Sequence, residues 1–141
     1  MQRPLDTKSD LRILLEAEAI LGLLALSQSG VFELISSDAL IFEIERTPDL
    51  TRREYALAIL SRAKHYIQLV PAIEERAREL VALGFKPLDA LHLASAVAGK
   101  ADYLCTCDDR FLKRADALKV ISTEVITPIE LIREVGRWKS K

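Results

Sequence analysis

Three acidic residues are spaced so that a layered α/β fold would bring them together, where they could hold a divalent metal ion. Glu43 lies on a predicted helix that follows an apolar strand, Asp89 opens an apolar helix, and Asp108 directly follows another apolar strand. Carboxylates gathered in one place repel one another, so the folded chain needs protons or a metal ion to hold them. Because no convergent set of His and Cys accompanies these acids, their oxygen ligands favour Mg²⁺ or Mn²⁺. An ion held in this way can activate water and stabilise in-line displacement at phosphorus.

Each of these residues also has an ordinary structural explanation. Asp is common at helix starts, so Asp89 taken alone is more often a cap than a functional acid. By spacing alone, three unrelated caps and surface acids are the commoner arrangement. His92, one turn after Asp89, is expected to be a packed, hydrogen-bonded residue rather than a general base. Cys105 and Cys107 are expected to be strand thiols rather than part of a zinc site, since no further soft ligands lie at suitable spacing.

Composition indicates one ordinary globular domain spanning residues 1–141. Half of the residues are hydrophobic, 29% are charged and the formal net charge is −1, which argues against disorder and against a global basic field for nucleic acid. The chain has only two cysteines, which favours a cytoplasmic location. It lacks an apolar run of about 18 residues, so no membrane-spanning helix is expected.

Short apolar strands alternate with helices along the chain. The expected strands are 31–35, 66–70, 103–106 and one within 119–127, and the expected helices are about 10–27, 38–46, 51–64, 71–83, 87–98, 108–117 and from 128 onward. This alternation with short connections predicts a layered α/β fold, with a mainly parallel sheet of about four strands and helices on both faces. Sites in such sheets form beyond the carboxyl ends of the strands, where the three acids are expected.

The chain resembles the PIN-domain family of metal-dependent ribonucleases, and in particular the toxin nucleases of VapC type. The resemblance extends over nearly the whole chain. Its strongest parts are Pro87–Ala96, which reads PLDALHLASA, and Leu104–Phe111, which reads LCTCDDRF. The serine at Ser37 with Glu43 six residues later resembles the second acidic motif of the family, and the helix start at 128–130 resembles its C-terminal end.

This resemblance implies a three-layer α/β/α fold and an endoribonuclease that hydrolyses RNA phosphodiester bonds with metal-activated water. The acidic site of the family then corresponds to Glu43, Asp89 and Asp108, with Asp109 a less favoured substitute for Asp108. Mg²⁺ or Mn²⁺ would be the cofactor, the chain would form a homodimer, and toxin members have a cognate antitoxin.

The chain departs from the family at its start, where members have an apolar strand that delivers an Asp. Leu5-Asp6-Thr7 imitates that motif, but Arg3 and Pro4 precede it, and proline cannot donate to a strand ladder. We therefore expect the first strand and its acid to be missing, with Asp6 as the alternative ligand, and we expect an impaired site. A catalytically inactive PIN-like module that acts in dimerisation, antitoxin binding or RNA binding is the second hypothesis. An α/β binding domain whose acids are only caps is a weaker third one.

Overall fold

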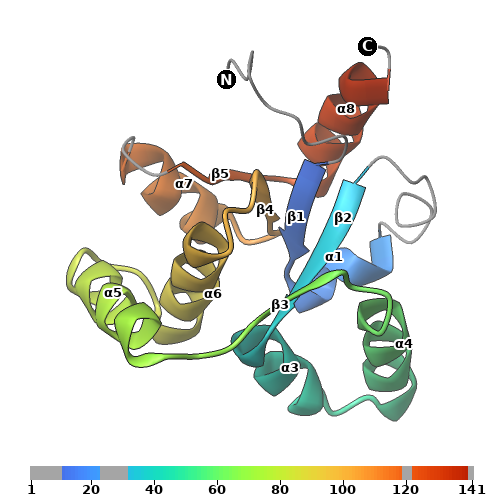
Figure 1. Cartoon of the computed structure of the whole chain (residues 1–141), viewed down its shortest axis with the longest axis horizontal. Coiled ribbons are helices and arrows are strands. Elements are labelled where there is room, and N and C mark those ends of the chain that lie inside the picture. The colour runs from blue at the N-terminus through green and yellow to red at the C-terminus, as the bar shows by residue number, and fades with distance from the viewer. Residues whose placement is uncertain (1–10, 23–31, 119–121, 140–141) are drawn as a thin grey trace.

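Five parallel strands form one sheet in the order β3-β2-β1-β4-β5 (Figure 1). The computed structural model describes residues 11–22, 32–118 and 122–139, and element labels follow Figure 1. The strands are β1 Leu11–Leu15, β2 Phe32–Ser37, β3 His65–Ile67, β4 Tyr103–Cys105 and β5 Glu124–Ile126. All four neighbouring strand pairs are parallel, as the alternation of strands and helices predicted.

Helices flank this sheet, so the predicted three-layer α/β/α arrangement is confirmed (Figure 1). The described helices are α1 Ala17–Gly22, α3 Asp38–Glu45, α4 Leu50–Leu60, α5 Pro71–Ala82, α6 Pro87–Ala98, α7 Asp109–Leu118 and α8 Pro128–Lys139. Helix α6 packs on α5 and also contacts α3. None of the helices in the described ranges is long and apolar enough to cross a membrane.

The core lies around the central strand β1 and the elements that cover it. Ile13, Leu14 and Leu15 in β1 are at most 1% exposed, as are Leu104 in β4 and Leu93 in α6. A parallel strand that is covered on both faces is expected to be apolar at nearly every position rather than at every second one. The sequence of β1, LRILL, has this composition.

The position of β1 corrects two of our expectations. Residues 11–15 were expected to belong to a helix over about 10–27, and the first strand of the sheet was expected to be missing. Instead, β1 is a strand paired with both β2 and β4, so the sheet has five strands rather than about four. The short apolar run caused the error, because periodicity alone does not distinguish a buried strand from a buried helix segment.

Candidate active site

The strand order places a topological switch point at the carboxyl ends of β1 and β4. The chain leaves β1 toward β2 on one side, and β4 lies on the other side of β1. In open parallel sheets, ligands bind in the crevice at such a point. Glu16 is the first residue after β1, and its N–H donates to the carbonyl of Cys105 at 3.0 Å. Thr106 directly follows β4, so these two residues meet at the edge where a site is expected.

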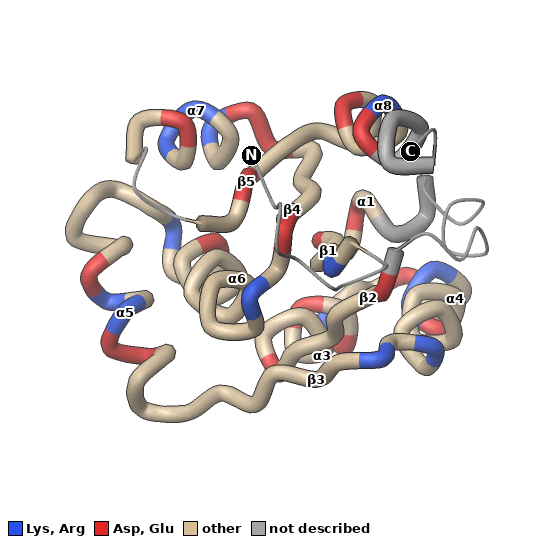
Figure 2. Tube along the Cα trace, turned by 45° about the horizontal axis from the view of Figure 1, so that its top comes forward, with Lys and Arg blue, Asp and Glu red and all other residues tan. Residues whose placement is uncertain are grey.

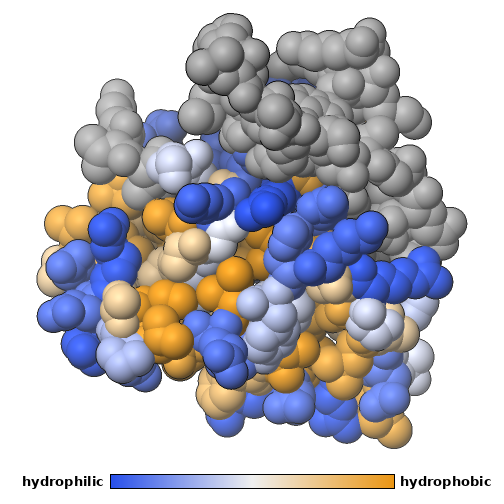
Figure 3. Space-filling model, viewed as in Figure 1, coloured by the Kyte–Doolittle hydropathy of each residue, from blue (hydrophilic) through white to orange (hydrophobic). Residues whose placement is uncertain are grey.

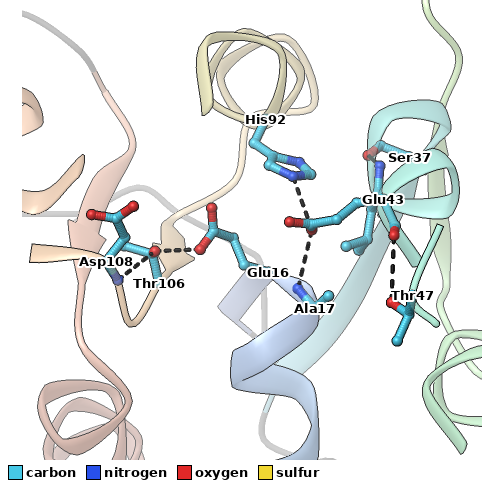
Figure 4. A network of polar contacts seen from close by, with 9 residues as sticks. Glu16, Ala17, Ser37, Glu43, Thr47, His92, Thr106 and Asp108 are labelled. Atoms are coloured by element: carbon cyan, nitrogen blue, oxygen red, sulfur yellow. Dashed lines mark hydrogen bonds and ion pairs between the residues drawn. The ribbon is translucent and has the colours of Figure 1, made fainter. Parts of the chain in front are cut away.

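Glu16 is a buried acid held by one hydroxyl group. Its residue is 8% exposed, and the hydroxyl of Thr106 donates to its Oε1 (Figure 4). The same hydroxyl oxygen accepts the N–H of Asp108 at 3.1 Å, which orients the Thr106 hydroxyl. Burial raises the pKa of Glu16 to about 7, against the lowering effects of Thr106 and His92, and nearby carboxylates raise it further.

Glu43 is held by two N–H donors. Leu40 and Ile44 in α3 are fully buried, so the side of the helix that carries them and Glu43 faces the interior. Oε1 of Glu43 accepts the backbone N–H of Ala17 at 3.3 Å and lies 3.2 Å from Nε2 of His92 (Figure 4). Burial raises the pKa of Glu43, but the hydrogen bond and charge of His92 together with the Ala17 N–H outweigh it, so the pKa lies below its ordinary value.

Asp89 lies in the first turn of α6, but it is not a helix cap. The cap position is Lys86, and this helix start has no side-chain cap bond. Asp89 is half-buried, and its carboxylate makes no hydrogen bond in the part of the chain that the structure describes. Burial raises the pKa of Asp89, and the charges of Asp108 and Glu43 add to this, against the lowering effects of His92 and Lys86.

Asp108 caps α7, so the capping explanation is correct for this acid. Its Oδ1 accepts the N–H of Arg110 at 2.8 Å and the N–H of Phe111 at 3.2 Å. Phe111 is 1% exposed, which fixes the start of α7 against the core. Asp109, the first residue of α7, is exposed.

The structure brings the three predicted acids to the same edge of the sheet as Glu16. The charges of Glu43 and Asp89 both raise the pKa of Glu16, and the charge of Asp108 raises that of Asp89. Among the described residues, however, no three or more His, Cys, Asp or Glu side chains converge closely enough to form a ready metal cluster. The acids therefore share a region without forming a closed ligand shell.

The donor set nevertheless fits a hard divalent cation. Thr106 holds Oε1 of Glu16, and Ala17 and His92 hold Oε1 of Glu43, so each carboxylate has a second oxygen outside these bonds. In Figure 4 the side chain of Glu43 points toward Glu16, whose own carboxylate points toward Thr106. All the acidic donors are oxygen ligands, which Mg²⁺ and Mn²⁺ prefer. Burial and nearby carboxylates raise the pKa of Glu16 more than Thr106 and His92 lower it.

Glu16 is the site residue that the sequence analysis missed. It was assigned to the interior of a long helix, although an acid directly after an apolar run of strand length would have indicated a strand end. Its presence corrects the expectation that no acid follows the first strand. Asp6, the alternative considered above, lies outside the described residues.

Comparisons with known proteins agree with this fold. The family model described as PIN domain matches residues 5–118. PAE2754 from Pyrobaculum aerophilum has a similar structure, with a TM-score of 0.62 and 18% identity, over 100% of this chain and 99% of its own. VapBC2 from Rickettsia felis, bound to a DNA fragment from its promoter, gives a TM-score of 0.56 and 15% identity over 82% and 98% of the two chains. The PIN domain endonuclease Utp24 gives a TM-score of 0.52 and 13% identity, over 86% of this chain and 88% of its own.

At these identities the structural likeness shows the fold alone. No curated protein matches the chain.

Proposed function

Because the chain belongs to the PIN domain family, we propose that it is a metal-dependent endoribonuclease of VapC type. One observation carries this proposal: four carboxylates from separate segments share the switch-point edge of the sheet, and the half-buried Asp89 among them has no hydrogen-bonding role among the described residues. A half-buried carboxylate without a partner is costly, which is more readily explained by a ligand than by packing.

Glu16, Glu43, Asp89 and Asp108 are the residues that would hold Mg²⁺ or Mn²⁺. When bound, the ion supplies Lewis acidity that activates water and offsets charge at phosphorus. The residues of the chain prepare the site for it. Glu16 can retain a proton near neutral pH, and since Thr106 donates to Oε1, that proton belongs on Oε2. Glu43 stays ionised because Ala17 and His92 donate to it, and the carboxylate of Asp89 makes no hydrogen bond among the described residues that an ion would have to displace.

RNA is the substrate that we propose. Helix α7 begins directly after Asp108 and carries Arg110, Lys113 and Arg114, which are among the basic residues marked blue in Figure 2. Side chains of this kind neutralise backbone phosphates. Substrate bound along α7 would thus reach the acidic edge at the point where that helix starts.

We also propose a cognate antitoxin, a homodimer and a cytoplasmic location. VapBC2, one of the structural neighbours, is described as bound to a DNA fragment from its promoter. Apolar residues gather over part of the face seen in Figure 3. Separately, four apolar side chains on or beside different helices are each more than half exposed: Phe42, Leu50, Leu83 and Ile129. Apolar surface of this kind is available for a protein partner.

Cleavage of a mixed RNA pool tests the enzymatic proposal. We expect the wild-type chain to cleave RNA with Mn²⁺ and to stop when the ion is chelated. Asp89→Asn should reduce the cleavage rate by at least roughly a hundredfold, because it removes one charge from the ligand set. Asp49→Asn is the matched control: Asp49 is an exposed cap of α4, and Asn caps equally well.

Two results would change the proposal. If Asp89→Asn cleaves as fast as the wild type, the acidic edge is not the active site. If the wild type binds RNA without cleaving it in Mn²⁺, the inactive module that acts in dimerisation, antitoxin binding or RNA binding becomes the better description.

A further inference from the structure

His92 is a fully buried polar side chain, and among the described residues only one of its two ring nitrogens has a hydrogen-bond partner. It lies one turn after Asp89 in α6 and is 0% exposed. Its Nε2 lies 3.2 Å from Oε1 of Glu43, whereas its Nδ1 is buried without a hydrogen-bond partner among the described residues. An imidazole kept in the core with one unpartnered nitrogen is costly, so packing alone does not explain a histidine here.

The direction of this hydrogen bond follows from a second donor. The backbone N–H of Ala17 donates to the same Oε1 of Glu43 at 3.3 Å, so this oxygen is an acceptor. Nε2 of His92 therefore carries the proton and donates. Two N–H groups from different elements, the start of α1 and the middle of α6, thus converge on one oxygen of a side chain from α3.

We propose that His92 is a positioning residue that holds Oε1 of Glu43 and so turns Oε2 toward Glu16. The other carboxylate oxygen of Glu43 lies on the Glu16 side in Figure 4. The side chain of Glu43 is 28% exposed, so it loses rotamer freedom, at an entropic cost, when it is fixed in one orientation. Donors that fix it before a ligand arrives remove that cost from the binding step.

The consequence for metal binding rests on the proposed function, but the orientation of Glu43 does not. The chain also offers a matched pair for comparison. Nε2 of His65 lies 2.6 Å from Oε1 of Glu33, with the two side chains 26% and 25% exposed. This pair joins β3 to β2 and involves none of the four acids, so its removal controls for the loss of a His–Glu contact as such.

The first test uses the metal-free chain and the amide proton of Ala17. This N–H belongs to the first residue of α1 and has no intrahelical partner, so its protection from solvent exchange reports the position of the Glu43 carboxylate. We expect His92→Leu to lower the exchange protection of Ala17 roughly tenfold or more, whereas His92→Gln, which keeps a donor of similar reach, restores it. The Ala19 N–H, which donates to the carbonyl of Glu16 at 2.9 Å, serves as the internal reference, and His65→Leu should change neither amide.

The second test is the affinity for Mn²⁺, measured by titration calorimetry on the same variants. Loss of a group that orients a ligand typically weakens binding by about 10–100-fold, so we expect at least a roughly tenfold loss in His92→Leu and near wild-type affinity in His92→Gln. In a Glu43→Ala background, His92→Leu should cause no further loss.

Unchanged protection of Ala17 in His92→Leu would overturn the inference, as would failure of His92→Gln to restore it. If His92→Leu does not fold, His92→Asn replaces it, because its shorter amide does not reach Glu43; equal protection in the Asn and Gln variants then overturns the inference. A wild-type chain that shows the expected amide pattern but binds no Mn²⁺ would support the orienting role and contradict the proposed function.

Discussion

The side chains of two glutamates lie at the same edge of the sheet, yet their surroundings shift the pKa values of the two carboxyl groups in opposite directions. Glu16 lies at the end of the central strand, where burial raises its pKa to about 7 and the hydroxyl of Thr106 only partly offsets this. Glu43 lies on a helix. Burial also raises its pKa, but the donors His92 and Ala17 outweigh burial, so the pKa lies below its ordinary value. Two N–H groups donate to the carboxylate of Glu43, whereas a hydroxyl group donates to that of Glu16.

This difference suggests how the metal-free protein tolerates several acids in one place. Glu43 keeps its negative charge because protein donors stabilise it, whereas Glu16 can take up a proton as pH falls toward neutrality. The proton on Glu16 then stands where a metal ion would otherwise supply positive charge. Binding of a cation would release that proton, so the affinity should rise with pH through about 7.

The largest expected effect comes from replacing the proton-binding member of the pair. The folded-state pKa of Glu16 lies above its unfolded value of 4.5, so folding favours the protonated carboxyl group. The contribution of Glu16 to stability is fully present below about pH 4.5. It is lost as pH rises through about 7, because the buried carboxylate must then be ionised. Glu16→Gln should therefore raise the free energy of unfolding of the metal-free chain at pH 8 by about 3 kcal/mol, while at pH 4 it changes little. Urea unfolding with a chelator present measures this.

The exposed Glu18, the second residue of helix α1, supplies the control, since Glu18→Gln should leave the pH dependence unchanged. Equal stability of Glu16→Gln and wild type at pH 8 would show that Glu16 is not a destabilising buried charge. The same substitution should abolish Mn²⁺-dependent cleavage.

The same change at Glu43 is expected to act with the opposite sign. The pKa of Glu43 is lowered, so its contribution to stability is present above the ordinary pKa of a glutamate and is lost as pH falls. Glu43→Gln should destabilise the chain by roughly 1–2 kcal/mol at pH 7, because it weakens hydrogen bonds to a charged acceptor, and by less at pH 4. A gain in stability at pH 7, measured by urea unfolding, would remove the contrast between the two glutamates.

A smaller effect is expected from Thr106, whose hydroxyl donates to Glu16. Thr106→Val removes the hydroxyl that lowers the pKa of Glu16, so the pKa should rise and Mn²⁺ binding should begin at a higher pH. The N–H of Asp108 also loses its acceptor, which costs about 1 kcal/mol. The buried Thr123, whose hydroxyl donates to the carbonyl of Ala101 at 2.8 Å, offers a control: Thr123→Val should lose similar stability but leave the pH dependence of Mn²⁺ binding unchanged.

The elements around the site could be predicted where the sequence carries local signals. Pro71 and Pro87 both open helices at the residue expected, because proline fits the first helical position. Asp89 and Asp108 were placed correctly at helix starts, and Glu43 was placed on the inward side of its helix. These assignments needed only the order of apolar and polar residues along the chain.

The central strand and the direction of the pKa shift of each acid could not be predicted in the same way. Leu11–Leu15 is buried on both faces, so it lacks the alternation that marks a strand, and Glu16 was hidden at its end. The opposite pKa shifts depend on contacts across long separations: Thr106 is 90 residues from Glu16, and Ala17 is 26 residues from Glu43. Such contacts exist only after the sheet has formed.

The smallest expected effect extends the comparison to the aspartates, which differ in the same way as the glutamates. The carboxylate of Asp108 accepts two backbone N–H groups, whereas that of Asp89 has no hydrogen bond among the described residues. Asp108→Asn should change the free energy of unfolding by less than about 0.5 kcal/mol, because Asn is an equally good cap. It should nevertheless lower the pKa of Asp89, whose raised value comes first from burial and then from the charge of Asp108.

Carbon-13 NMR titration of the Asp89 carboxyl group in the metal-free chain measures this change. Asp108→Ala is the companion variant: it should lower the pKa of Asp89 in the same direction and also cost about 1 kcal/mol through loss of the cap. An unchanged Asp89 titration in both variants would mean that the charge of Asp108 does not reach Asp89. Asp108 would then be only a cap, and the ion would be left with Glu16, Glu43 and Asp89 as its acidic ligands.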